Sequence, residues 1–235
     1  TISGVIWKAM ESGGNQAVRF VISIVLARML DPENYTTLAL LLIFVNIADV
    51  FVKRGFSTSL VQRKDADNTD FSSVLWASLA IAGILYLALF FGAPYIAQFY
   101  EEPLITPALR VVSVILFSGA FNSVQSAIIT RKLEFRKLCM ATLGATLVSG
   151  GVGIYMAYAG YGVWALVVQQ MLGSFATVVL LWSLDRWKPA LVFSMERVKL
   201  LFDFGWKLLV SSLLDTGYSS LSSLVIGKRY IGDSL

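Results

Sequence analysis

The sequence has no histidine, a single cysteine and few charged residues, and each shortage excludes a class of function. Without histidine, the chain lacks the commonest acid–base catalyst and metal ligand. One cysteine, Cys139, cannot form an internal disulfide framework. Charged residues make up 14% of the chain, whereas soluble domains hold about 25%. We therefore expect no catalytic constellation, no metal site, no cofactor and no soluble fold.

The sequence contains long hydrophobic runs. Hydrophobic residues form 57% of the 235 residues, and the mean hydropathy is +0.71. A membrane-spanning helix needs about 20 mostly apolar residues. Four runs meet this length, at 72–99, 107–129, 138–159 and 163–184. Three further segments are apolar but interrupted by polar side chains, at 4–30, 35–52 and 200–226. The sequence therefore predicts an all-α, polytopic transmembrane helical bundle with seven spans.

The connections between these runs are short and carry turn residues. Asp70 or Ser72 is expected to cap the start of the third span. We expect residues 1–185 to form an N-terminal lobe of six transmembrane helices. Residues 186–199 would be a cytoplasmic connection, and 200–235 the first helix of a second lobe.

A weak internal echo supports this division into lobes. Trp7-Lys8 near the start of the first span recurs as Trp206-Lys207 in the seventh, and both spans carry polar faces. Transporters are often built from such repeats, with the binding site between the two halves. The chain opens on an apolar run at Thr1 and stops without a tail, so we expect it to be part of a longer protein.

Lysine and arginine are unevenly distributed among the connections. The connections after the second, fourth and sixth predicted spans hold four each, whereas the other three hold one, one and none. Positively charged loops remain in the cytoplasm. We therefore expect a multi-pass membrane protein with a cytoplasmic N-terminus. Because the basic clusters lie between apolar runs, the bilayer is the expected partner and nucleic acid is not.

Polar side chains follow one face of four predicted spans. The first span carries Lys8, Glu11, Ser12, Asn15, Arg19 and Ser23. The seventh carries Asp203, Lys207, Ser211, Asp215, Tyr218 and Ser222. The second offers Asn46, Asp49 and Lys53, and the fourth offers Arg110, Ser113, Asn122, Gln125 and Ser126. A charge that faces acyl chains costs about 3 kcal/mol on insertion scales. These faces therefore predict a hydrated interior cavity for a polar or anionic ligand.

Local pairing is the alternative explanation for these charges. Lys8 with Glu11, Asp49 with Lys53, and Asp203 with Lys207 are spaced three or four residues apart, so each pair can form on one helix. Arg19 has no acidic residue one turn away on its own helix, which makes it the best single candidate for contacting an anion. The glycines of the fifth span, Gly144, Gly150, Gly151 and Gly153, are expected to serve helix packing.

Several segments resemble those of one known family. The run Leu26-Ala27-Arg28-Met29-Leu30-Asp31-Pro32-Glu33-Asn34-Tyr35 is similar to a segment of the Wzx-type oligosaccharide flippases, which are bacterial polysaccharide exporters of the multidrug/oligosaccharidyl-lipid/polysaccharide exporter superfamily. Further matches, in the same order and spacing, lie at 55–56, 60–65, 131–136, 160–170 and 204–206. The branch that the chain most resembles exports units such as those of colanic or teichuronic acid.

The resemblance implies a two-lobed transporter that moves an undecaprenyl-diphosphate-linked oligosaccharide across the inner membrane by alternating access, for surface polysaccharide or lipopolysaccharide biosynthesis. The lobes would rock around a cationic cavity, and the polysaccharide polymerase machinery is a possible partner. The cations expected to meet the diphosphate are Lys8, Arg19 and Lys207. The polar residues expected to contact sugar are Ser12, Asn15, Asn122 and Gln125. The residues that could couple an ion are Glu11, Asp49, Asp203 and Asp215.

Two other functions fit the sequence less well. A multidrug or cation antiporter of the same superfamily would have a cavity dominated by acidic residues such as Asp49, Asp203 and Asp215. The basic motif segments favour the flippase instead. A membrane enzyme of glycan assembly generally needs a large external loop or a catalytic histidine, and here the loops are short and histidine is absent.

Overall fold

A computed structural model describes residues 2–62, 67–185, 187–199, 201–202, 206 and 209–214. Its main elements are seven helices: α1 (Ile2–Ala27), α2 (Pro32–Gln62), α3 (Asn68–Phe99), α4 (Ile105–Val112), α5 (Ile115–Arg131), α6 (Phe135–Tyr158) and α7 (Val163–Leu184). The described part of the chain contains no strand.

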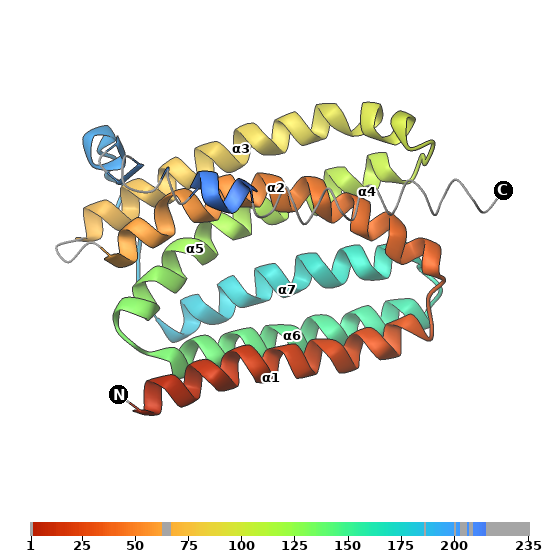
Figure 1. Cartoon of the computed structure of the whole chain (residues 1–235), viewed down its shortest axis with the longest axis horizontal. Coiled ribbons are helices and arrows are strands. Elements are labelled where there is room, and N and C mark those ends of the chain that lie inside the picture. Colours follow the sequence, from red (N-terminus) through yellow and green to blue (C-terminus); the bar gives the residue numbers. More distant parts are fainter. Residues whose placement is uncertain are drawn as a thin grey trace.

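Five helical stretches are long and apolar enough to cross a membrane, at Pro32–Lys53, Asn68–Tyr100, Ile105–Arg131, Phe135–Tyr158 and Val163–Leu184. The prediction of an all-α, polytopic membrane bundle is confirmed. Helix α1 does not reach the same hydropathy because of its polar face, but it runs alongside α6 (Figure 1). Most of the predicted seventh span, 200–226, lies outside the described residues.

The fourth predicted span is confirmed as the apolar stretch Ile105–Arg131, which contains a local turn. Helices α4 and α5 meet at a turn formed by Ser113 and Val114. The buried Ser113 hydroxyl donates to the Leu109 carbonyl at 2.6 Å, and the Val114 amide donates to Val111 at 3.2 Å. A serine hydroxyl that bonds back to the preceding turn often bends a helix. Hydropathy remains high through this turn, so the sequence pattern could not reveal it.

The helices form two layers (Figure 1). Helices α1, α6 and α7 pack in one layer, and α2, α3, α4 and α5 pack in the other. Contacts of α7 with α5 and α2 join the layers. The start of α1, the end of α2, the start of α3, the α5–α6 connection and the end of α7 all lie at the same end of the bundle (Figure 1). That end carries Arg131 and Lys132 at the end of α5, and Arg136 and Lys137 at the start of α6, so it is called the positive end below.

Glycines allow the helices of the first layer to approach closely. A Cβ at Gly150 would overlap the side chain of Ile22, so this glycine fixes the approach of α6 to α1. Cβ atoms at Gly153 and Gly144 would come within 3.0 Å of Gln169 and 3.2 Å of Leu180, both on α7. Gly151 faces open space. The packing role predicted for these glycines is therefore confirmed at three of the four positions.

The start of α3 is capped by a different residue from those expected. Asp67 is the N-cap and accepts from the Asp70 amide at 3.0 Å, while the Asp70 carboxylate accepts from the Asp67 amide at 3.1 Å. This reciprocal arrangement is a capping box, which satisfies amides that the first turn leaves free. Asp70 thus contributes as the third helical residue, and Ser72 is left for another contact described below.

Candidate functional site

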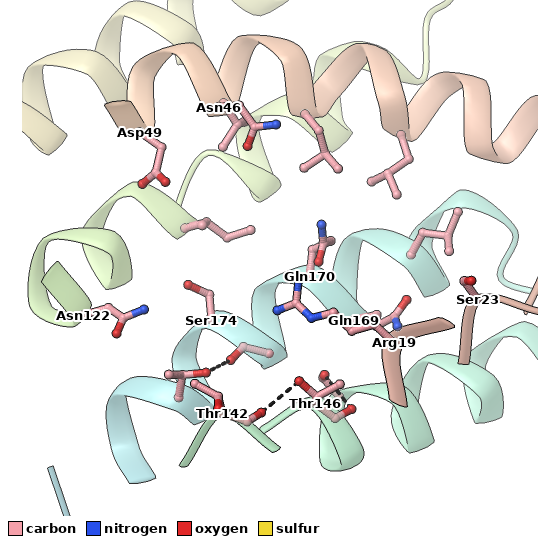
Figure 2. Close-up of a pocket in the computed structure, with 18 of the residues that line it drawn as sticks. Arg19, Ser23, Asn46, Asp49, Asn122, Thr142, Thr146, Gln169, Gln170 and Ser174 are labelled. Atoms are coloured by element: carbon pink, nitrogen blue, oxygen red, sulfur yellow. Dashed lines mark hydrogen bonds between the residues drawn. The ribbon is translucent and has the colours of Figure 1, made fainter. Parts of the chain in front are cut away.

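A cavity of about 480 Å³ lies between the two helical layers (Figure 2). Its walls come from α1, α2, α5, α6 and α7. The polar lining residues are Arg19, Ser23, Tyr35, Asn46, Asp49, Lys53, Asn122, Thr142, Thr146, Ser149, Gln169, Gln170, Ser174 and Thr177. Several leucines, together with Val45 and Ile115, complete the wall. The structure therefore contains the polar interior that the polar faces of the predicted spans indicate.

Arg19 reaches into this cavity from the first helical layer. It lies on α1 and points towards the region of α7 that carries Gln169 and Gln170 (Figure 2). None of the ion pairs formed among the described residues includes Arg19. A guanidinium in this setting presents several donors to an incoming anion.

Lys53 also lines the cavity, but its charge is already balanced. Its ammonium lies 2.6 Å from the Asp49 carboxylate one turn earlier on α2. Gly119 of α5 leaves room for this pair, because a Cβ there would lie 2.6 Å from Asp49 Oδ1. The prediction of local pairing is therefore confirmed for Asp49 and Lys53. Among the described lining residues, Arg19 and Lys53 are positive and Asp49 is negative, which gives a net charge of +1. Because Lys53 is paired with Asp49, Arg19 supplies this net charge.

Hydroxyl groups line the α6 wall and connect it to α1. Thr146 Oγ1 donates to Asn15 Oδ1 at 2.6 Å. Thr142 lies one turn before Thr146, and Ser149 follows it by three residues. Across the cavity, Asn122 Oδ1 accepts from Ser126 at 3.1 Å. Asn15 thus lies beside the cavity and positions a hydroxyl of its wall.

The remaining predicted site residues are placed differently. Ser12 is exposed and Glu11 is half-buried, and neither lines the cavity. Gln125 is 4% exposed and lies outside the lining, and neither polar atom of its amide has a hydrogen-bond partner in the described structure. The side chain of Lys8, together with Asp203, Lys207 and Asp215, lies outside the described residues.

Arg110 does not face the cavity, which corrects the expectation for the polar face of the fourth span. Its Nε donates to the Phe90 carbonyl at 3.2 Å, and its guanidinium carbon lies 4.3 Å from the centre of the Phe90 ring. Pro94 lies four residues after Phe90 inside α3 and has no N–H, so the Phe90 carbonyl lacks its helical donor. Arg110 therefore satisfies a backbone group that Pro94 leaves free.

A sequence model of a family described as polysaccharide biosynthesis protein matches residues 25–235. The chain belongs to this family. It is 26% identical to the succinoglycan biosynthesis transport protein ExoT of Rhizobium meliloti (strain 1021) over 226 residues. The aligned region covers 96% of this chain and 46% of that protein. The motif resemblance to bacterial polysaccharide exporters is thus confirmed.

Two further relatives have similar identities. The teichuronic acid biosynthesis protein TuaB of Bacillus subtilis (strain 168) is 26% identical over 190 residues, or 79% of this chain and 38% of TuaB. The lipopolysaccharide biosynthesis protein WzxC of Escherichia coli (strain K12) is 24% identical over 234 residues, or 97% of this chain and 47% of WzxC. The chain spans less than half the length of each of these relatives. No solved structure matches it significantly.

In this member of the polysaccharide biosynthesis family, sequence reasoning missed most of the wall that α6 and α7 provide. Two sets of lining residues repeat at positions i, i+4 and i+7: Thr142, Thr146 and Ser149 on α6, and Gln170, Ser174 and Thr177 on α7. This is the spacing of one helix face. The same signal identified the charged faces of the first two spans, so uncharged polar residues at this spacing would have identified the wall.

The positive end of the bundle carries several ion pairs outside the cavity. Lys132 lies 2.8 Å from Asp185, and Arg197 lies 2.6 Å from Asp67. The pKa of Asp67 is lowered, first by the hydrogen bond from the Asp70 amide and then by the one from Arg197. The described residues at this end therefore pair many of their charges, in contrast to Arg19. No group of three acidic or cysteine side chains in the described part of the chain is placed to hold a metal ion.

Proposed function

We propose that the full-length protein is a transporter, and not an enzyme, that flips an undecaprenyl-diphosphate-linked oligosaccharide repeat unit across the bacterial inner membrane by alternating access. The observation that carries this proposal is a polar cavity inside a membrane bundle, in which Arg19 supplies the unbalanced positive charge. Membership of the polysaccharide biosynthesis family and similarity to a protein named as a transport protein support it.

The chemistry of the cavity suits the two parts of such a head group. A diphosphate oxygen would accept charge-assisted hydrogen bonds from the Arg19 guanidinium, which is a geometry that arginine favours. Sugar hydroxyls both donate and accept hydrogen bonds, as do the amides of Asn46, Gln169 and Gln170. The outer faces of α3 and α6 expose apolar residues such as Ile84, Leu87, Leu147 and Val148, so the lipid tail would remain in the bilayer.

The distribution of charge supports an orientation. The start of α1 and the basic α5–α6 connection share the positive end of the bundle, so this end would face the cytoplasm. The substrate would enter the cavity from that side and leave from the other, where the polymerase machinery would receive it. Residues 1–185 would form the first lobe, 186–199 the cytoplasmic connection, and 200–235 the first helix of the second lobe. Lys207 would add a second cation to the site from that helix.

A cation antiporter is the less favoured function. It would need carboxylates that dominate the cavity, whereas the acidic residue in the described lining, Asp49, is paired with Lys53. The described lining therefore carries a net positive charge, which suits an anionic ligand.

The test uses the full-length protein in a bacterial strain whose own flippase is deleted. Surface polysaccharide and cytoplasmic-leaflet lipid-linked repeat units would be measured for the wild type and for Arg19→Ala, Lys207→Ala and Arg28→Ala. Arg28 is the matched control, because it follows α1, is exposed and does not line the cavity.

We expect the wild type and Arg28→Ala to restore surface polysaccharide. Arg19→Ala and Lys207→Ala, inserted at normal levels, should accumulate the lipid-linked intermediate. If the wild type leaves the glycan unchanged and confers drug efflux, the flippase proposal is wrong. Normal export by both cavity variants would leave the flippase in place but remove these cations from its mechanism.

A further inference from the structure

Residues 187–198, which follow α7, lie against the first turns of α3 instead of crossing freely to the next helix. The Ala190 amide donates to the Ser72 hydroxyl at 2.9 Å, and the Ser194 amide donates to the Ser73 hydroxyl at 3.0 Å. The indole of Trp76 donates to the Ala190 carbonyl at 3.1 Å. Three hydrogen bonds therefore bind the backbone of this segment to side chains of α3.

The two serines are fully buried beneath the segment, each with 0% of its surface exposed. A buried backbone amide without a partner costs free energy comparable to a lost hydrogen bond. Residues 190 and 194 lie outside a regular helix, so their amides need acceptors from elsewhere. Ser72 and Ser73 provide these acceptors from adjacent positions on one helix.

Aromatic and apolar contacts extend the same attachment in both directions. The Trp187 indole donates to Asn68 Oδ1 at 2.6 Å, and its ring lies edge-on to Phe71 at 6.5 Å between centres. Val198, which is 8% exposed, and Leu201, which is 2% exposed, belong to the same apolar cluster as Phe71. Detaching the segment would expose these side chains to water.

Charge completes the attachment at its far end. Arg197 Nη1 lies 2.6 Å from Asp67 Oδ1 and 3.2 Å from Asp70 Oδ1, the two residues of the α3 capping box. The Asp70 side chain is completely buried. The segment is thus fixed to the backbone-capping residues of α3 as well as to its side chains.

We propose that residues 187–198 form a strap that remains docked on α3 throughout the transport cycle, and that the hinge between the two lobes lies after Leu201, which packs in the same apolar cluster. The connection then moves as part of the first lobe, and α3 carries it. This consequence for transport rests on the proposed function, whereas the docking itself does not.

The first measurement is hydrogen exchange in the full-length protein in lipid nanodiscs. The variant Ser72→Ala/Ser73→Ala removes both acceptors, and we expect exchange of the strap amides to become roughly fivefold to tenfold faster. The matched control is Ser78→Ala, on the same helix, because Ser78 is equally buried but its hydroxyl has no hydrogen-bond partner in the described structure. Strap exchange as fast as that of an unfolded peptide in the wild type would overturn the proposal.

The second measurement tests whether the strap stays docked during transport. In a full-length protein whose native cysteines are replaced, the variant Ser73→Cys/Ser194→Cys would be joined by a short bifunctional thiol reagent, and export would be compared before and after joining. Export that stays within twofold supports the docked strap. Export that is lost on joining and restored with a cleavable reagent after reduction overturns it. The exchange result remains informative even if the wild type fails to export glycan, so the two proposals can fail separately.

Discussion

Arg19 and Arg110 both lie on helices of the bundle, but their surroundings differ. Arg110 donates to the Phe90 carbonyl and stacks over the Phe90 ring, so its donors serve the fold. Arg19 lines a polar cavity and takes part in none of the ion pairs among the described residues. A cationic side chain in such a bundle therefore indicates a binding site only where its hydrogen-bond donors are not already bound to other groups of the protein.

The largest expected effect separates these two arginines by transport. Arg19→Ala should lower export per inserted molecule roughly tenfold to hundredfold, which corresponds to one lost charge-assisted hydrogen bond. Arg110→Ala should leave export per folded molecule near the wild-type value while lowering stability by about 1–3 kcal/mol, because the Phe90 carbonyl loses its donor. Export assays combined with thermal unfolding in detergent measure both. Equal loss of export in the two variants would contradict the distinction between a binding role for Arg19 and a structural role for Arg110.

Lys53 is an intermediate case, since it lines the cavity but pairs with Asp49 at 2.6 Å. Asp49→Asn should free this ammonium, so the double variant Arg19→Ala/Asp49→Asn should export roughly fivefold to tenfold better than Arg19→Ala alone. The control is Arg19→Ala/Asp31→Asn, because Asp31 is exposed in the α1–α2 connection. A double variant with no export at all would instead indicate that Asp49 carries a coupling ion.

A smaller effect tests why Arg110 is bound. Pro94→Ala restores an N–H that can donate to the Phe90 carbonyl. Arg110→Ala should then cost less in the Pro94→Ala background, by about 0.5–1.5 kcal/mol. Thermal unfolding of the two single variants and the double variant gives this coupling energy. Strictly additive losses would show that Arg110 acts through the Phe90 ring or through packing alone.

The smallest effect concerns Arg197, whose charge is paired outside the membrane spans. The pKa of Asp67 is lowered in the folded protein by the Asp70 amide and by Arg197. A lowered carboxyl pKa contributes stability that is present above the ordinary value of about 3.9. This contribution is lost as the pH falls through the lower folded-state pKa. Hydrogen exchange of the strap should therefore be constant near neutral pH, once corrected for intrinsic rates, and become faster only in acid. Asp67→Asn should abolish that acid dependence.

The helices could be predicted from the sequence because a run of about 20 apolar residues has few other structures available to it. The turn at Ser113 and Val114 could not, since hydropathy does not change there. Arg19 could be selected because no acidic residue lies one turn away. Arg110 could not be told apart from it, because its partner is a backbone carbonyl freed by Pro94. The strap could not be predicted from the sequence either, because two of its hydrogen bonds are donated by backbone amides.

The size of the cavity limits how much of a substrate this lobe can enclose. The cavity has a volume of about 480 Å³. Pockets in this range enclose drug-sized molecules, roughly the size of a diphosphate carrying one or two sugars. The later sugars of a longer repeat unit would lie beyond these walls. Under the proposed function, such a cavity would recognise the end that all of the lipid-linked substrates share and would tolerate variation in the glycan that follows.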